Sequence, residues 1–155
     1  MKKIMFVCHG NICRSPMAEF VFLDMLKKRG LSDKITALSS ATSTEEIGND
    51  VHRGTKVILT KYNIPFKRRE AVQLTRSDYD KYDLFVGMDS ANIRNMHRIF
   101  GTDPNGKIVR LLDLTDEPRD VADPWYTGNF EVTYRDVVKG SEALIEHIIR
   151  GCHIW

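Results

Sequence analysis

The sequence lacks a long apolar segment. The apolar run near its N-terminus covers only residues 4–8, whereas a membrane-spanning helix needs about 20 such residues and a secretory signal also needs a longer apolar centre. An excess of either charge is lacking too, since 23 Lys and Arg accompany 21 Asp and Glu. The charge therefore gives no reason to expect a nucleic acid or an anionic membrane as a partner, and we expect a cytoplasmic protein.

Cysteine is scarce, with three residues in a chain of 155. The number is odd and no pair has the spacing of a zinc-binding motif, so neither a disulfide scaffold nor a structural metal site is indicated. Linkers, internal repeats and low-complexity tracts are also missing, and the length fits one folded unit. The sequence therefore predicts a single domain over residues 1–155 that uses no metal and no cofactor.

The most informative stretch that is present covers residues 8–16, between an apolar run and a helical pattern. Five residues separate Cys8 from Arg14, which suits one tight loop that brings a sulfur and a guanidinium to the same bound anion. Gly10 permits a close approach of the backbone, and Asn11 tolerates the left-handed region. The stretch predicts an anion-binding loop that carries a nucleophile.

A helix is expected to begin directly after this loop. Ser15 followed by Pro16 predicts a hydroxyl cap and a proline at the first helical position, where no backbone donor is lost. The free N–H groups and the positive end of the helix dipole would then stabilise a bound phosphate. They would also stabilise Cys8 as a thiolate, which is the nucleophilic form.

Apolar periodicity predicts that strands and helices alternate along the chain. Alternation of this kind implies a parallel sheet with right-handed crossovers, in a three-layer α/β domain. Ligands of such sheets bind beyond the carboxyl ends of the strands, where the Cys8 loop is expected to lie. The predicted strands are 4–7, 35–39, 84–88 and 108–112, the predicted helices are 16–29, 51–62, 90–100 and 134–149, and 40–50 and 113–128 are expected to be loops. Asp89-Ser90 is expected to cap the helix 90–100.

Residues 8–16, with the strand before and the helix after them, resemble the active-site loop of the low-molecular-weight protein tyrosine phosphatases. The chain length, the place of the loop and the late segment 123–126 resemble that family too, so the resemblance covers essentially the whole chain. It implies four parallel strands in the order 2-1-3-4. It also implies hydrolysis of phosphotyrosine proteins or small aryl phosphates through a phosphocysteine intermediate, with inorganic phosphate or a similar anion held in the loop.

The resemblance implies three catalytic residues. Cys8 is the nucleophile, Arg14 clasps two phosphoryl oxygens through its forked guanidinium, and Asp123 protonates the leaving oxygen and later activates water. The residues expected to bind or shape the substrate lie in the loop and just after Asp123. They are His9, Gly10, Asn11, Ile12, Cys13, Ser15, Trp125 and Tyr126.

The choice of Asp123 depends on its context, because an Asp-Pro pair is a common turn element and Asp103-Pro104 is a second one in this chain. Trp125 and Tyr126 follow Asp123 closely and would flank a pocket for an aromatic substrate. Asn-Gly follows Asp103-Pro104, which is ordinary turn chemistry. We therefore expect Asp123 in the site and Asp103 in a turn.

Two further expectations come from the family. Residues that match Asn11 and Ser15 hold the loop and the sulfur in place there, assisted by a serine that we match to Ser40. A reversible disulfide between Cys8 and Cys13 would protect the nucleophile, since a neighbouring thiol captures a sulfenic acid before further oxidation. A packing role for Cys13 is the alternative.

The sequence departs from the family at positions that concern substrate choice. Glu45 stands where many relatives have an aromatic pocket wall, which predicts looser stacking of a phosphotyrosine ring. Arg69 and Val72 stand where a histidine and an arginine are common, so support for the loop is expected to be rearranged.

Four other functions compete with this interpretation. An arsenate reductase of the same fold needs two further cysteines, and only Cys152 lies outside the loop. A protein-arginine phosphatase of the family carries threonine where this chain has Ile12. An idle phosphopeptide-binding module would have no need for an intact cysteine, arginine and Asp-Pro pair. A nucleotide-binding P-loop is disfavoured because its Gly-Lys-Ser/Thr ending is absent.

Overall fold

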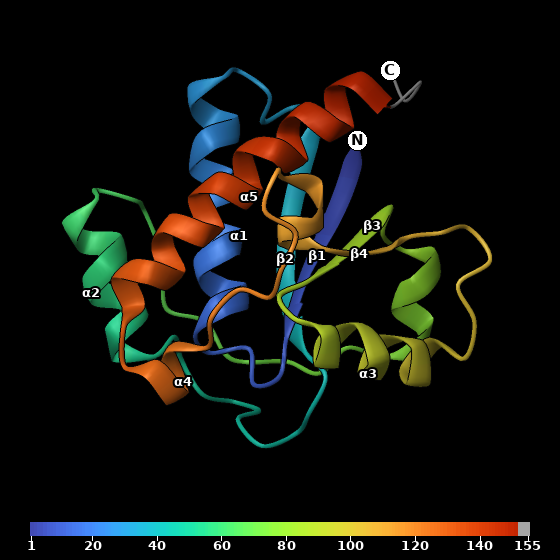
Figure 1. The fold of residues 1–155 in the computed structure, drawn as a ribbon, viewed down its shortest axis with the longest axis horizontal. Helices are drawn as coiled ribbons and strands as arrows, with labels where there is room; N and C mark the ends of the chain where they lie inside the picture. Colours follow the sequence, from blue (N-terminus) through green and yellow to red (C-terminus); the bar gives the residue numbers. More distant parts are fainter. Residues whose placement is uncertain (152–155) are drawn as a thin grey trace.

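A sheet of four parallel strands runs through the middle of the computed structural model, which describes residues 1–151 (Figure 1). Its order is β2-β1-β3-β4, with every neighbouring pair parallel. The predicted three-layer α/β class and the strand order implied by the family are thereby confirmed. The strands are β1 (Lys2–Cys8), β2 (Ile35–Ala41), β3 (Leu84–Gly87) and β4 (Ile108–Arg110).

Helices cover both faces of this sheet. Figure 1 shows α1, α2 and α5 gathered on one side of the strands and α3 on the other. The four helices expected from periodicity are all present, with ends that differ from the predicted ones by a few residues. The helices are α1 (Arg14–Lys28), α2 (Arg53–Lys61), α3 (Ser90–Phe100), the short α4 (Pro124–Thr127) and α5 (Phe130–Gly151), with the 3-10 helices η1 (Arg76–Asp80) and η2 (Leu111–Leu114).

The central strand β1 separates two apolar cores. Side chains alternate along a strand, so Ile4 and Phe6 pack with α1, α2 and α5, whereas Met5 and Val7 pack with β3 and α3 on the other face. This explains why the strand consists of a continuous apolar run and not of an alternating one. Both faces of β1 are buried, which fixes the position of Cys8 at its carboxyl end.

Two segments differ from the sequence prediction. The predicted strand 108–112 ends at Arg110, and Leu111 and Leu112 enter η2, where both are buried. Helix α5 approaches η2 closely at Gly140, where an added Cβ would lie 2.3 Å from Leu111 Cγ. The expected loop 113–128 also contains α4, which Asp123 caps through a hydrogen bond from Trp125 N.

The carboxyl ends of β1 and β3 bring distant parts of the chain together. Residues 9–13 follow β1, Asp89 follows β3, and the segment that leads to Asp123 passes the same edge, where Val121 N donates to Met88 O at 2.9 Å. This is the edge at which a ligand was expected. Among residues 1–151, no helix combines the length and the apolarity needed to cross a bilayer, and no group of three or more His, Cys, Asp or Glu is placed to hold a metal ion.

Candidate active site

A cavity of about 380 Å³ opens at this edge of the sheet. It brings together all three predicted catalytic residues and most of the predicted binding residues. Asn11 and Ser15 are the exceptions, since both are buried and do not line the cavity. The lining residues are Cys8, His9, Gly10, Ile12, Cys13, Arg14, Glu45, Glu46, Asp89, Ala91, Asn92, Asn95, Asp123, Trp125 and Tyr126.

Helix α1 begins earlier than the sequence predicts. Cys13 is its N-cap and makes no capping bond with its side chain, so Arg14 is the first helical residue and Ser15 is not the cap. Pro16 is third in the helix, where its missing N–H still has no intrahelical partner to lose. Ser15 is thereby released for a different contact, and Arg14 is held rigidly in the first turn.

The Cys8 sulfur accepts polar contacts at the base of the cavity. Ser15 Oγ lies 3.0 Å from Cys8 Sγ, and the backbone N–H of Asn11 donates to the sulfur at 3.3 Å. Asn11 Nδ2 donates to Ser15 Oγ at 2.8 Å, which leaves the serine hydrogen available to the sulfur. Hydrogen bonds to the charged form stabilise a thiolate relative to a thiol.

Asn11 adopts the left-handed conformation expected from the sequence, with φ of 59°. Its side chain donates to Ser39 Oγ at 3.0 Å, whereas Ser40 Oγ is buried without a hydrogen-bond partner. The assignment of Ser40 as the supporting serine is therefore wrong, and Ser39 has that place. Neighbouring side chains of β2 point to opposite faces, so a shift of one residue exchanges the two. Ser39 in turn donates to Glu19 at 2.5 Å, and burial raises the pKa of this carboxyl.

The two departures in the segment after α2 still support the loop. The Arg69 guanidinium donates to Asn11 O, and the backbone N–H of Val72 donates to Asn11 Oδ1 at 3.2 Å. The Val72 contact uses the main chain, so it does not depend on which side chain stands there. The sequence identified these two positions only as departures from the family and did not predict their hydrogen bonds to Asn11.

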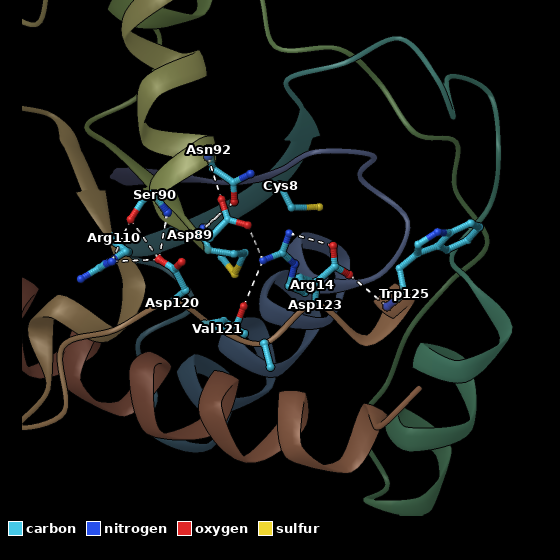
Figure 2. A network of polar contacts seen from close by, with 12 residues as sticks. Cys8, Arg14, Asp89, Ser90, Asn92, Arg110, Asp120, Val121, Asp123 and Trp125 are labelled. Carbon is cyan, nitrogen blue, oxygen red and sulfur yellow. Dashed lines mark hydrogen bonds and ion pairs between the residues drawn. The ribbon is translucent and has the colours of Figure 1, made fainter. Parts of the chain in front are cut away.

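Arg14 is almost fully buried, with 3% of its surface exposed, and three groups hold its guanidinium (Figure 2). Nη1 donates to Asp89 Oδ2 at 2.8 Å and to Val121 O at 3.1 Å, and Nη2 donates to Asp123 Oδ2 at 3.3 Å. Burial acts to lower the pKa of Arg14, but Cys8 and the two carboxylates outweigh it and raise the pKa above its ordinary value. The guanidinium is thus a fixed positive charge in the wall of the cavity.

Asp89 is the main residue of the site that the sequence analysis assigned only a local role. It was expected to cap α3, and its Oδ1 does accept from Asn92 N at 2.8 Å. Its second oxygen holds Arg14 from 75 positions away. The available signal was its place directly after β3, because the carboxyl ends of parallel strands share one edge.

The two Asp-Pro pairs lie in the different places expected from their context. Asp123 lies in the cavity wall, with Trp125 and Tyr126 strongly exposed at the mouth. Asp103 instead holds a turn, since its carboxylate accepts from Tyr79 Oη at 2.5 Å and from Lys107 N at 2.8 Å. Of these two aspartates, Asp123 lines the cavity and Asp103 does not.

The rim and the second thiol complete the site. Glu45 lines the cavity at the position where many relatives have an aromatic residue, and its carboxylate accepts from exposed His9 at 2.9 Å.

Cys13 is buried, and burial raises the pKa of its thiol to about 12, with Cys8 and Asp123 acting in the same direction. At neutral pH Cys13 is protonated and does not compete as a nucleophile. The disulfide with Cys8 stays a prediction, and Cys152 lies outside the described residues.

Comparison with known proteins gives one consistent result. A family model described as low molecular weight phosphotyrosine protein phosphatase matches residues 3–152. The chain is 41% identical to the low molecular weight protein-tyrosine-phosphatase YfkJ of Bacillus subtilis over 150 residues, which cover 96% of each protein. It is 39% identical to PtpA of Staphylococcus aureus strain MRSA252 over 159 residues, which cover 99% of this chain and 98% of that protein.

Solved structures agree with the sequence matches. The crystal structure of YfkJ superimposes with a TM-score of 0.94 at 40% identity, covering 97% of this chain and 96% of that one. The phosphatase SP-PTP of Streptococcus pyogenes superimposes with a TM-score of 0.86 at 40% identity, covering 96% and 93%. With the loop, the buried arginine and the sheet order described above, these matches show that the chain belongs to the low-molecular-weight protein tyrosine phosphatase family.

Proposed function

We propose that this protein is a protein-tyrosine phosphatase that hydrolyses aryl phosphate monoesters through a phosphocysteine intermediate. One observation carries the proposal: the Cys8 sulfur, the Arg14 guanidinium and the Asp123 carboxylate line the same cavity. A nucleophile, a bidentate cation and an acid are the groups that transfer of a phosphoryl group to a thiolate requires. Its substrates are phosphotyrosine proteins or small aryl phosphates, and its location is the cytoplasm.

The reaction proceeds in two displacements. The Cys8 thiolate attacks phosphorus, a P–S bond forms, the P–O bond to the aryl group breaks, and the departing oxygen takes a proton from Asp123. Water then attacks the phosphocysteine while Asp123 accepts its proton, and the P–S bond breaks to release inorganic phosphate and the thiolate. The same carboxyl group thus acts as an acid in the first step and as a base in the second.

Substrate binding prepares Asp123 for the first step. In the structure the carboxylate accepts from Arg14 at 3.3 Å, and a phosphate dianion in the loop would take over the guanidinium donors. Asp89 keeps its own contact with Arg14, so the guanidinium remains anchored while Asp123 is released.

The walls of the cavity favour an aryl group over the competing substrates. Ile12, Trp125 and Tyr126 supply apolar and aromatic surface, which suits a phosphotyrosine ring. Arsenate reduction is disfavoured because Cys13 is buried and protonated.

The first test is a comparison of three peptides that differ only in the modified residue. We expect kcat/KM for the phosphotyrosine peptide to exceed the values for phosphoserine and phosphoarginine by at least ~100-fold, since a single methylene group in an apolar pocket already changes this ratio by roughly 10- to 200-fold. Steady-state phosphate release measures all three. A phosphoarginine value equal to or above that of phosphotyrosine would assign the protein to the arginine phosphatases, and no release from any of them would make it a binding module.

The second test examines the general acid. Asp123→Asn is expected to lower kcat/KM for phosphotyrosine by roughly 100-fold or more and for nitrophenyl phosphate by much less, since a nitrophenolate leaves without full protonation. The matched control is Asp103→Asn, which alters the other Asp-Pro pair and should lower thermal stability without any preference between the two substrates. Equal losses on both substrates in Asp123→Asn would exclude Asp123 as the acid.

A further inference from the structure

The carboxylate of Asp120 binds the segment before Asp123 to the start of helix α3. Asp120 Oδ1 accepts from Ser90 N at 2.9 Å, from Ser90 Oγ at 3.1 Å and from Arg110 Nη1 at 2.8 Å (Figure 2). Arg110 Nη1 also donates to Ser90 Oγ at 3.0 Å. One oxygen therefore joins the end of β4, the first turn of α3 and the segment that leads to Asp123.

The N-terminus of α3 thereby holds two parts of the candidate active site. Ser90 is the first residue of the helix, so its N–H has no intrahelical acceptor, and Asp120 supplies one. Asp89, the N-cap, holds Arg14 through its other oxygen. The Arg14 guanidinium and the segment before Asp123 are thus held by adjacent residues, Asp89 and Ser90, at one end of a helix.

Only two residues separate Asp120 from Asp123, and both are anchored by their main chains. Val121 is 1% exposed, donates to Met88 O at 2.9 Å and accepts from Arg14. Ala122 O accepts from Thr133 Oγ1 at 3.0 Å. Asp120 directly precedes this pair, and its side chain contacts the edge of the sheet at Arg110. Loss of its contacts would leave the segment before Val121 held by Arg119, which donates to Asp120 O at 3.1 Å and pairs with Asp136 on α5, but without its bonds to the first turn of α3.

We propose that Asp120 is a positioning residue for the general acid: by binding Ser90 and Arg110 it fixes the backbone that presents Asp123 to the leaving oxygen. The inference rests on the proposed role of Asp123. Burial acts to raise the pKa of Asp120, but the hydrogen bonds from Ser90 and Arg110 outweigh it and hold the pKa below its ordinary value. The carboxylate is therefore charged at neutral pH and keeps all three donors.

A positioning role makes a specific kinetic prediction. The displaced acid transfers its proton less well, so the loss grows as the leaving group becomes more basic. The effect is expected in kcat/KM, because this constant covers the steps up to the departure of the aryl oxygen. Asp120→Ala is expected to lower kcat/KM for phenyl phosphate by roughly tenfold, about 1.4 kcal/mol, and for nitrophenyl phosphate by less than ~3-fold.

Asp113→Ala is the matched control. Asp113 is also partly exposed and accepts from Nε and Nη2 of Arg110 at 2.9 and 2.7 Å, but it has no hydrogen bond to Ser90. This variant removes an ion pair of the same arginine without releasing the segment before Asp123. We expect it to change kcat/KM for both substrates by less than ~2-fold. A leaving-group preference as large as that of Asp120→Ala would assign the effect to Arg110 alone and overturn the inference.

Asp120→Asn provides a second variant of nearly the same shape. It retains an acceptor for Ser90 N but not the charge for Arg110, so its leaving-group preference should lie between those of the wild type and Asp120→Ala. Equal losses on both substrates in the two Asp120 variants, with the preference intact in Asp123→Asn, would overturn the inference and leave the proposed function standing. If Asp120→Ala does not fold, the absence of a preference in Asp120→Asn decides against it. A missing preference in Asp123→Asn would instead contradict the general-acid role itself.

Discussion

Cys8→Ser is expected to abolish turnover of phosphotyrosine peptides while binding of inorganic phosphate persists. A serine hydroxyl is a far weaker nucleophile than a thiolate at neutral pH, and the contacts that support the sulfur, from Ser15 Oγ and Asn11 N, contain no general base that would activate it. We expect kcat to fall by more than roughly 10⁴-fold, as in enzymes that lose their nucleophile. Steady-state kinetics measures the loss, and the thermal shift caused by phosphate measures binding.

The same variant identifies the intermediate. Wild-type protein quenched in acid during turnover of a labelled aryl phosphate should carry label on the peptide that contains Cys8, and Cys8→Ser should carry none. Retained turnover in the variant, or label on another residue of the wild type, would contradict the phosphocysteine mechanism. A variant that binds no phosphate and unfolds at lower temperature would show that Cys8 is needed for the structure of the loop.

Arg14→Lys is the second change with a very large expected effect, at least ~100-fold in kcat/KM. A lysine supplies one point charge and cannot make the two parallel contacts of a guanidinium to a phosphoryl group. Arg14 donates to Asp89 and Val121 O from Nη1 alone, which leaves its other nitrogens for a phosphate, whereas a lysine has a single nitrogen for all three acceptors. Kinetics with nitrophenyl phosphate suffices for the measurement.

The control for this change is Arg29→Lys, which makes the same exchange at the other end of α1. Arg29 pairs with Glu146 at 3.1 Å on the surface and does not line the cavity. Exposed pairs of this kind contribute little to stability, so we expect unchanged kinetics. A loss below tenfold in Arg14→Lys, about 1.4 kcal/mol of barrier, would indicate that Arg14 acts mainly in holding the structure together.

The sequence predicted best what depends on neighbouring residues. The apolar periods located the strands and the four longer helices, and the cap of α3 at Asp89 is confirmed. The short helices η1 and α4 were missed because neither has enough turns for a period to be visible. Helix α1 was placed two residues late because Ser15 fits the pattern of a cap, whereas its hydroxyl contacts Cys8 instead.

The candidate site was predictable where one loop carries it and not where distant segments meet. Residues 8–15 share a short stretch, so their arrangement around an anion follows from spacing and glycine chemistry. Ser39 and Asp89 are brought to the loop by the sheet, and a pattern of apolar residues does not say which of two adjacent serines faces α1. The catalytic roles of Cys8, Arg14 and Asp123 stay predictions that the variants above test.

The buried, left-handed Asn11 also affects how tightly an anion binds. Its conformation is fixed from three sides, by Ser39, Arg69 and Val72, before any ligand arrives. The conformational entropy of shaping the loop is therefore lost when the chain folds and does not weaken the affinity for phosphate. The affinity of the cavity is consequently coupled to the stability of residues 69–72, a segment that contributes no atom to its wall.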